Sequence, residues 1–142
     1  MGPSQLSLLE GPNVERLSGG TSFEDDIRQF TWNGRPTDVE MTEADCDGHS
    51  VRAKTFTNEF WTSKQRAGHS LHEISYRACF KPQLVDFFVQ RLTEPGDLVY
   101  DPFMGRGTTV VEAALLDRAA AGCDVNPLSR VLTKPRLAPP TL

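Results

Sequence analysis

Apolar and polar positions follow their clearest pattern between residues 81 and 127. In residues 82–92 the apolar side chains recur at helical spacing, with Pro82 in the expected first turn. Leu-Val-Tyr at 98–100 predicts a short buried strand after the stop at Pro95-Gly96. Residues 108–118 predict a second helix, and Cys-Asp-Val at 123–125 predicts a second strand closed by Asn126-Pro127. The expected order is helix, strand, helix, strand.

The second helix should present one apolar stripe to the sheet. We expect Val110, Val111, Ala114 and Leu115 to form this stripe, and Gly122 to mark the end of the helix. A strand, a crossover helix and a further strand imply a right-handed βαβ unit in a parallel sheet. Such sheets bind ligands beyond the carboxyl ends of their strands, where Asp101 and Asp124 are expected.

The first 50 residues show no comparable periodicity. Residues 1–20 are rich in glycine, proline and serine and predict a mobile leader or a loosely docked arm. Thr21-x-x-Glu24 is a capping-box pattern that predicts a short helix. Residues 31–50 are acidic and contain the breakers Asn-Gly-Arg-Pro and Cys-Asp-Gly-His, so they are poor candidates for core. We therefore expect an acidic, loosely structured arm over residues 1–50 and a folded domain over residues 51–142.

Composition places the chain among globular proteins of one domain or part of one. It has 142 residues, of which 38% are hydrophobic and 24% charged. No apolar run approaches the roughly 20 residues of a membrane span, and no signal-peptide pattern opens the sequence, so no membrane partner is expected. The three cysteines, Cys46, Cys79 and Cys123, form no Cys-x-x-Cys pair. These features fit a reduced, cytoplasmic protein.

The net charge of −4 conceals a split along the chain. Residues 1–50 carry 3 basic and 10 acidic side chains, a balance of −7, whereas residues 51–142 carry a balance of +3. A basic segment before the glycine-rich stretch is suited to approach phosphates, although a solvated polar surface explains it equally well. Its members are Arg52, Lys54, Lys64, Arg66, Arg77 and Lys81.

The candidate chemistry lies in residues 101–109, Asp-Pro-Phe-Met-Gly-Arg-Gly-Thr-Thr. Gly105 and Gly107 allow the backbone to turn sharply and to approach a ligand, and the helix that follows presents unpaired N–H groups to an anion. Asp124 is placed to accept hydrogen bonds from ribose hydroxyls. The dinucleotide motif would need glycine where Val110 stands, and the P-loop would need a lysine after Gly107. S-adenosylmethionine (SAM), a nucleoside with an amino-acid tail and no diphosphate, fits better.

Structural explanations compete with some of these assignments. The glycines could serve only a tight strand-to-helix turn, although the flanking acids argue against that explanation. Cys46-x-x-His49 and His69-x-x-His72 have ligand-like spacing, but no second cysteine pair completes a tetrahedral site, so no metal is expected. Phe60-Trp61 is better explained by packing than by stacking on a base. His69, His72 and Tyr76 are better explained as packing or surface residues than as catalysts.

Three segments together resemble a known family. Asp-Pro-Phe-Met-Gly-Arg-Gly-Thr-Thr resembles the SAM-binding motif of the amino-methyltransferases that modify exocyclic amines of DNA bases. Phe-Lys-Pro-Gln-Leu at 80–84 resembles their second cofactor motif, which opens the preceding helix. Gly-Cys-Asp-Val-Asn-Pro at 122–127 resembles their second-strand ending. The three segments occur in the expected order within residues 80–130.

The resemblance implies an α/β, Rossmann-like SAM-dependent methyltransferase fold, present here as an incomplete helix–β–α–β portion. It implies methyl transfer from SAM to the amino group of adenine or cytosine in DNA, after extrusion of the base from the duplex. In this reading Phe103 lies against the cofactor, Asp124 holds the ribose, and Lys81 flanks the amino-acid end. The implied cofactor-binding residues are Lys81, Pro82, Asp101, Pro102, Phe103, Gly105, Gly107, Thr108, Thr109, Asp124 and Asn126.

The catalytic loop of that family does not occur in this sequence. The loop reads Asp, Asn or Ser, then Pro-Pro and an aromatic residue, whereas the one Pro-Pro pair here lies in Ala-Pro-Pro-Thr-Leu at 138–142. We therefore assign no catalytic residue and expect a truncated chain, one subunit of a split enzyme, or a degenerate relative. In each case an oligomer or a partner chain should cover the exposed sheet. An RNA base methyltransferase fragment and a non-catalytic SAM-binding or partner-binding module remain as alternatives.

Overall fold

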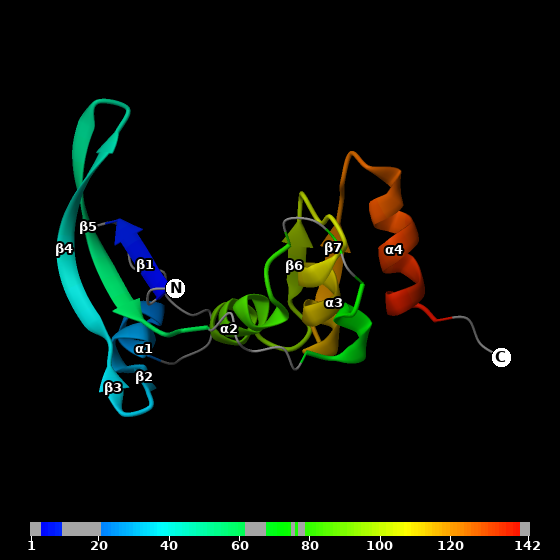
Figure 1. Cartoon of the computed structure of the whole chain (residues 1–142), viewed down its shortest axis with the longest axis horizontal. Helices are drawn as coiled ribbons and strands as arrows, with labels where there is room; N and C mark the ends of the chain where they lie inside the picture. The colour runs from blue at the N-terminus through cyan, green and yellow to red at the C-terminus, as the bar shows by residue number, and fades with distance from the viewer. Residues whose placement is uncertain (1–3, 10–20, 62–67, 75, 77–78, 140–142) are drawn as a thin grey trace. The chain divides into compact units, whose positions relative to one another are not determined.

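The computed structural model describes residues 4–9, 21–61, 68–74, 76 and 79–139 (Figure 1). The chain divides into two compact units, Met1–Thr62 and Ser63–Leu142. The first unit is an antiparallel sheet with one helix. The second holds a parallel pair of strands with its helices, as the pattern of residues 81–127 predicts.

Unit 1 is built on a three-stranded antiparallel sheet in the order β1-β5-β4. Its strands are β1 (Ser4–Leu9), β4 (Asp38–Cys46) and β5 (His49–Asn58). The last pair of the β4–β5 ladder is Cys46 opposite His49, so a two-residue loop joins the strands. Asp47 and Gly48 in that loop have φ values of 52° and 79°. Two consecutive positive φ values are typical of the type I′ turn, which Asp-Gly favours.

A second, smaller hairpin follows the same rule. Strands β2 (Thr31–Trp32) and β3 (Arg35–Pro36) are antiparallel and are joined by Asn33 and Gly34, with φ values of 49° and 76°. The Asn-Gly and Asp-Gly pairs, interpreted from sequence as breakers, are therefore hairpin turns. Unit 1 is thus more regular than the loosely structured arm expected from the sequence.

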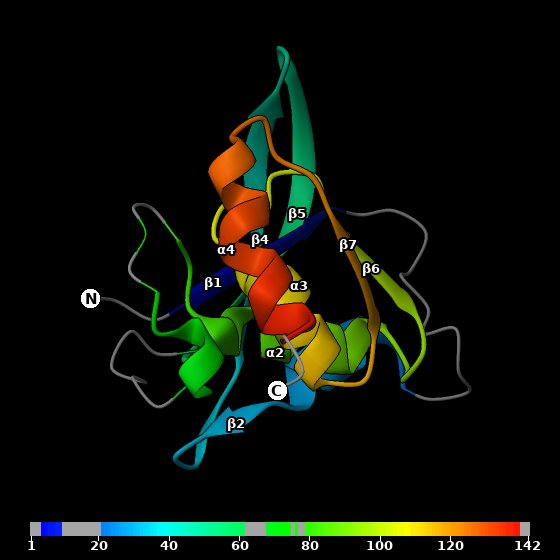
Figure 2. The same ribbon diagram turned by 90° about the vertical axis from the view of Figure 1, so that its right-hand side faces the viewer.

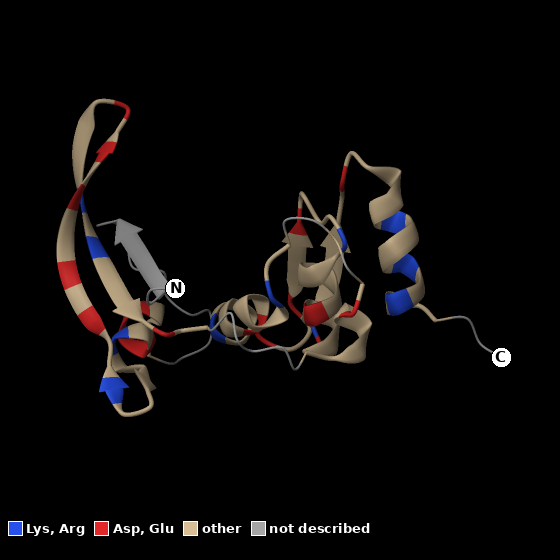
Figure 3. Cartoon of the chain, viewed as in Figure 1, with Lys and Arg blue, Asp and Glu red and all other residues tan. Residues whose placement is uncertain are grey.

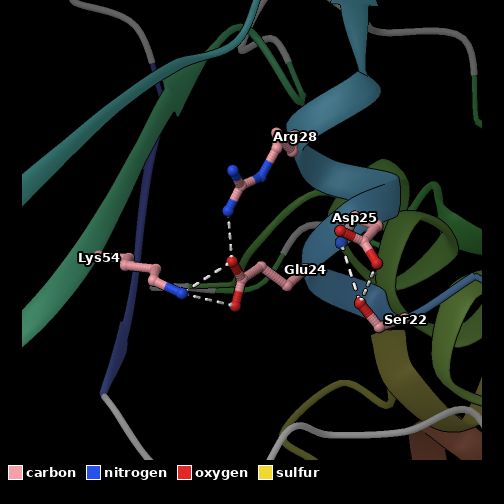
Figure 4. A network of polar contacts seen from close by, with 5 residues as sticks. All are labelled: Ser22, Glu24, Asp25, Arg28 and Lys54. Carbon is pink, nitrogen blue, oxygen red and sulfur yellow. Dashed lines mark hydrogen bonds and ion pairs between the residues drawn. The ribbon is translucent and has the colours of Figure 1, made fainter.

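Helix α1 (Phe23–Gln29) belongs to unit 1, and the prediction of a short helix here is confirmed. Its N-cap is Ser22, whose hydroxyl accepts a hydrogen bond from the Asp25 amide, one residue later than the predicted cap. Phe23 and Ile27 of the helix are buried, as is Phe56 of β5. Glu24 forms ion pairs with Arg28 of its own helix and with Lys54 of β5 (Figure 4).

The boundary between the units differs from the predicted boundary after residue 50. That position lies inside β5, which pairs with β4 on one side and with β1 on the other. The division falls after Thr62 instead. The composition shift near residue 50 follows the exposed strand β4, whose ribbon carries several acidic residues, coloured red in Figure 3. This shift does not mark the edge of a domain.

Unit 2 contains the predicted βαβ arrangement. Its elements are the 3₁₀ turn η1 (Ser70–His72), α2 (Pro82–Leu92), β6 (Leu98–Asp101), α3 (Thr108–Leu115), β7 (Ala119–Gly122) and α4 (Pro127–Leu137). Strands β6 and β7 are parallel, with Leu98 opposite Ala119 and Asp101 opposite Gly122. Lys81 is the N-cap residue of α2 and Pro82 begins the helix, so the predicted start of this helix is confirmed.

The second strand begins four residues earlier than predicted. Helix α3 ends at Leu115, and Asp117 adopts the left-handed conformation, with a φ of 62°. Arg118 fixes this end by donating to the carbonyls of Leu116 and Thr93. The alanines at 119–121 therefore form β7 rather than helix, and Gly122 lies in the strand rather than at the helix end.

Two expectations about burial also change. The buried small residue of α3 is Ala113, whereas Ala114 and Leu115 are exposed. Strand β6 is not fully buried, because Leu98 and Tyr100 are 66% and 58% exposed. Figure 2 shows α3 and α4 on the same side of the β6–β7 pair. Within the described residues of unit 2, no helix covers the opposite face of these two strands.

Helix α4 completes unit 2 and was not predicted. The Asn126 side chain accepts a hydrogen bond from the Leu128 amide, and Pro127 occupies the first helical position, a favoured N-terminal combination. Among the described helices, none has both the length and the apolar character that crossing a membrane requires.

Candidate cofactor site

The predicted site is a turn that joins β6 to α3. Asp101 ends β6, and its Oδ1 accepts a hydrogen bond of 3.0 Å from the Phe103 amide. Gly105 and Gly107 have φ values of 50° and 82°, a region in which glycine is far less strained than other residues. The positive φ values confirm the sharp turn predicted from the two glycines.

The strand pairing continues beyond the ends of β6 and β7. The Cys123 amide donates to the Asp101 carbonyl, and the Met104 amide donates to the Cys123 carbonyl, each at 3.0 Å. These bonds hold the loop after β7 beside the glycine turn. Asp101 and Asp124 therefore lie at the same edge of the parallel pair, as the topology predicts.

Asp124 connects the two loops through its carboxylate. Oδ2 accepts from the Gly105 amide and Oδ1 accepts from the Asn126 amide, both at 2.8 Å. The hydrogen bond from Asn126, followed by that from Gly105, lowers the pKa of Asp124 below its ordinary value. A carboxylate oxygen can accept two hydrogen bonds, so this ionised group retains acceptor capacity for a ligand hydroxyl.

The two glycines have different surroundings. A Cβ at Gly107 would lie 2.5 Å from Thr133 Oγ1 and 3.1 Å from Val110 Cγ2, so the space beside Gly107 is filled by α4 and α3. Among the described residues, a Cβ at Gly105 would meet Tyr76 Cε1 alone, at an ordinary contact distance of 3.6 Å. Gly107 therefore permits close packing of the protein, whereas Gly105 leaves the turn more accessible.

The aromatic residue of the motif is exposed. Phe103 is 85% exposed, and Pro102 before it is also exposed. Val125, in the loop after β7, is fully exposed as well. The exposed phenyl ring offers an apolar surface for a planar ligand, and the carboxylates of Asp101 and Asp124 at the same edge of the strands offer acceptors for its polar groups.

Several of the remaining predicted residues lie away from Asp101 and Asp124. Thr108 is buried and its hydroxyl accepts from Arg106 Nε, whereas Thr109 contributes to an apolar cavity of about 360 Å³ beside α2. Lys81 and Pro82 border a separate cavity of about 150 Å³ with His72 and Arg106. Asn126 lies next to the site and caps α4. The structure thus joins Gly105, Asp124 and Asn126 by direct hydrogen bonds, and the Phe103 amide donates to Asp101 in the same turn.

Sequence reasoning missed the residue between the glycines. Arg106 is 9% exposed, and its guanidinium donates to backbone carbonyls of the segment that precedes α2. An arginine in a loop is ordinarily exposed, so its residue type gave no signal of burial. Its position between the two glycines of the turn was the one feature of the sequence that could have drawn attention to it.

A comparison with known protein families identifies the family of this chain. The DNA methylase family designated N6_N4_Mtase matches residues 21–130. The chain belongs to this DNA methylase family. The match confirms the resemblance seen in the sequence motifs, and it extends over both units, including the hairpins of unit 1.

Curated relatives of this chain are substantially longer than it is. The type II methyltransferase M.MjaII of Methanocaldococcus jannaschii is 36% identical over 77 residues, 54% of this chain and 14% of that protein. The type II methyltransferase M.BsoBI of Geobacillus stearothermophilus is 29% identical over 137 residues, 93% and 27% respectively. The orphan methyltransferase M.BamHII of Bacillus amyloliquefaciens is 29% identical over 110 residues, 70% and 42%. The chain spans at most 42% of these three relatives.

Solved structures of related proteins show weaker similarity. The crystal structure of the M1.HpyAVI–SAM complex has a TM-score of 0.45 and 22% identity, covering 63% of this chain and 50% of that one. The SAM complex of TTHA0409 from Thermus thermophilus has a TM-score of 0.41 and 20% identity, covering 96% and 70%.

Proposed function

We propose that this chain forms the SAM-binding portion of a DNA amino-methyltransferase, which methylates the exocyclic amine of adenine or cytosine. The observation that carries the proposal is the pair of carboxylates, Asp101 and Asp124, at the carboxyl ends of two parallel strands beside an exposed Phe103. Membership of the DNA methylase family supports the same ligand and the same substrate class.

The site residues suit the parts of SAM. The exposed ring of Phe103 would lie against the adenine, and the ionised Asp124 would accept hydrogen bonds from the ribose. The carboxylate of Asp101 would attract the ammonium group of the methionine tail. When bound, SAM supplies an electrophilic methyl group, and the residues of this chain hold and orient the molecule.

We propose further that the catalytic Pro-Pro-aromatic loop comes from residues outside these 142 or from a second chain. The support is that the sequence carries this loop nowhere, and that the open face of β6 exposes Leu98 and Tyr100. In this proposal the chain alone binds SAM without transferring methyl groups to DNA. A partner or a second copy would cover the open face.

Calorimetric titration of the purified chain with SAM tests the proposed function. We expect SAM to bind and NAD and ATP, added as controls, not to bind. Asp124→Ala should weaken SAM binding about tenfold or more, because the ribose loses a charged acceptor and the turn loses two hydrogen bonds. Asp86→Ala is the matched control and should bind like the wild type, because the half-buried Asp86 accepts a hydrogen bond from Gln90 of its own helix α2. Equal affinity of all three proteins for SAM would contradict the assignment of Asp124.

A further inference from the structure

The side chain of Arg106 holds a segment of the chain against the glycine turn. Nη1 donates to the Ile74 carbonyl at 2.6 Å and to the His72 carbonyl at 3.1 Å. Nε donates to the Thr108 hydroxyl at 3.0 Å, which orients the guanidinium from the first residue of α3. One buried side chain thus joins the glycine turn, the start of α3 and the segment before α2.

Further contacts fix the same segment, of which the structure describes residues 68–74 and 76. His72 Nε2 lies 2.6 Å from the carboxylate of Glu112 on α3. Arg136 of α4 donates to the Leu71 carbonyl at 3.1 Å and also to the Arg106 carbonyl. Helices α3 and α4 therefore both fasten the described part of this segment, called here the covering segment.

The covering segment brings the ring of Tyr76 to the turn. Tyr76 Cε1 lies 3.6 Å from the position that a Cβ would take on Gly105. The amide of Gly105 is the group that donates to Asp124. Tyr76 is half-buried, and its carbonyl accepts a hydrogen bond from the Cys79 thiol at 3.1 Å. The ring therefore lies beside Gly105, the residue whose amide donates to Asp124.

We propose that Tyr76 forms a wall of the SAM pocket and that Arg106 is the positioning residue that sets this wall. The inference rests on the proposed function and adds two residues to its site. Tyr76 contacts the bound cofactor through its ring, which offers a flat and partly exposed surface. Arg106 acts through the covering segment, because its donors are engaged by backbone carbonyls and by Thr108.

The geometry requires arginine at position 106 rather than a cation in general. The planar guanidinium directs several N–H donors from one group, whereas an ammonium is a compact charge on a flexible stem. Lysine in place of Arg106 therefore cannot satisfy the carbonyls of His72 and Ile74 and the Thr108 hydroxyl together. The expected consequence is a loosened covering segment and a displaced Tyr76 ring.

The test compares four variants by SAM titration. Tyr76→Ala should raise the dissociation constant for SAM about tenfold, and Tyr76→Phe should restore it to within about twofold of the wild type. Arg106→Lys should also raise it about tenfold. The matched control is Arg118→Lys, because Arg118 likewise donates to two carbonyls and a threonine hydroxyl, but at the other end of α3.

A second readout separates positioning from general stability. Amide hydrogen exchange at Ile74 and Tyr76 should speed up about tenfold or more in Arg106→Lys and should be unchanged in Arg118→Lys. Both arginine variants should lose thermal stability, but only Arg106→Lys should lose affinity for SAM. Parallel losses of affinity in both would show that Arg106 acts through stability alone and would overturn its positioning role.

The outcomes distinguish this inference from the proposed function. If the wild type binds SAM and Tyr76→Ala binds it equally well, the wall is refuted and the proposed function stands. If Tyr76→Phe fails to restore the affinity lost in Tyr76→Ala, the contact is not made by the ring, and the wall is refuted as well. If the wild type does not bind SAM, the proposed function fails and the inference falls with it.

Discussion

At the scale of single residues, the two glycines of the motif meet two requirements, a left-handed backbone and close packing, which sequence alone does not separate. Both glycines have positive φ values, yet only Gly107 lies where a side chain would strike Thr133 and Val110. The sequence predicted the turn correctly because the left-handed conformation strongly favours glycine. It could not predict the packing role of Gly107, because Thr133 belongs to a helix that the pattern did not reveal.

Gly107→Ala is expected to destabilise unit 2 by about 2–4 kcal/mol, from backbone strain and a forced shift of Thr133 together. The matched control is Gly96→Ala, because Gly96 has a φ of 92° and no atom within 4 Å of its Cβ position. The control should cost only about 1–2 kcal/mol for the left-handed conformation. Urea denaturation followed by circular dichroism measures both. Equal losses would show that Thr133 accommodates the added methyl group without cost.

Asp124 should make the turn sensitive to acid. Its pKa is lowered in the folded protein by hydrogen bonds from the Asn126 and Gly105 amides. The stabilisation is therefore present above the ordinary aspartate pKa of about 3.9 and is lost as the pH falls through the lower folded value. The melting temperature of Asp124→Asn should lie below that of the wild type at about pH 6. The two should converge near about pH 2, and a constant difference would contradict the assigned cause.

At the scale of elements, the predictions succeeded where periodicity was long and failed where turns decided the outcome. Helix α2 starts at Pro82, as expected from its apolar spacing. Strand β7 was misplaced because alanines favour helix, and only pairing with β6 and the left-handed Asp117 overrule that preference. The hairpins of unit 1 were missed because Asn-Gly and Asp-Gly were interpreted as breaks rather than as type I′ turns.

An ion pair between Glu24 and Lys54 links helix α1 to strand β5, and its contribution to stability can be tested by mutation. Glu24 lies 3.0 Å from Lys54 Nζ and 2.6 Å from Arg28, and the hydrogen bond from Lys54 is the main cause that lowers its pKa (Figure 4). Glu24→Gln should destabilise unit 1 by about 0.5–1 kcal/mol, since partly exposed ion pairs contribute modestly.

The fluorescence of Trp32 and Trp61, the two tryptophans of the chain, measures the effect of Glu24→Gln, since both belong to unit 1. The exposed Glu40 of β4 provides the matched control, Glu40→Gln, which should change stability little. The loss at Glu24 should shrink in about 1 M salt because added ions screen the pair. A loss that is independent of salt would point to packing instead of charge.

At the scale of the whole molecule, unit 2 resembles part of a larger sheet more than a finished domain. The helices cover one face of the two described strands, and the other face leaves Leu98 and Tyr100 exposed (Figure 2). The sequence predicted the parallel pair and an uncovered sheet. It misjudged the burial of β6 because an apolar strand has the same pattern whether its second face is covered within the chain or by another partner.

The open face of β6 should make the chain associate with itself when no partner is present. Exposed apolar side chains on a sheet favour association, since burial removes them from water. Sedimentation velocity at rising protein concentration should therefore show dimers or larger species.

Leu98→Lys should weaken this association about tenfold or more, because a charge would have to be buried at the contact. Val131→Lys is the matched control, because Val131 of α4 is also 66% exposed but lies on a helix. Association that is equally weakened by both changes would locate the contact elsewhere, and a chain that stays monomeric at every concentration would contradict the proposal that this face requires a cover.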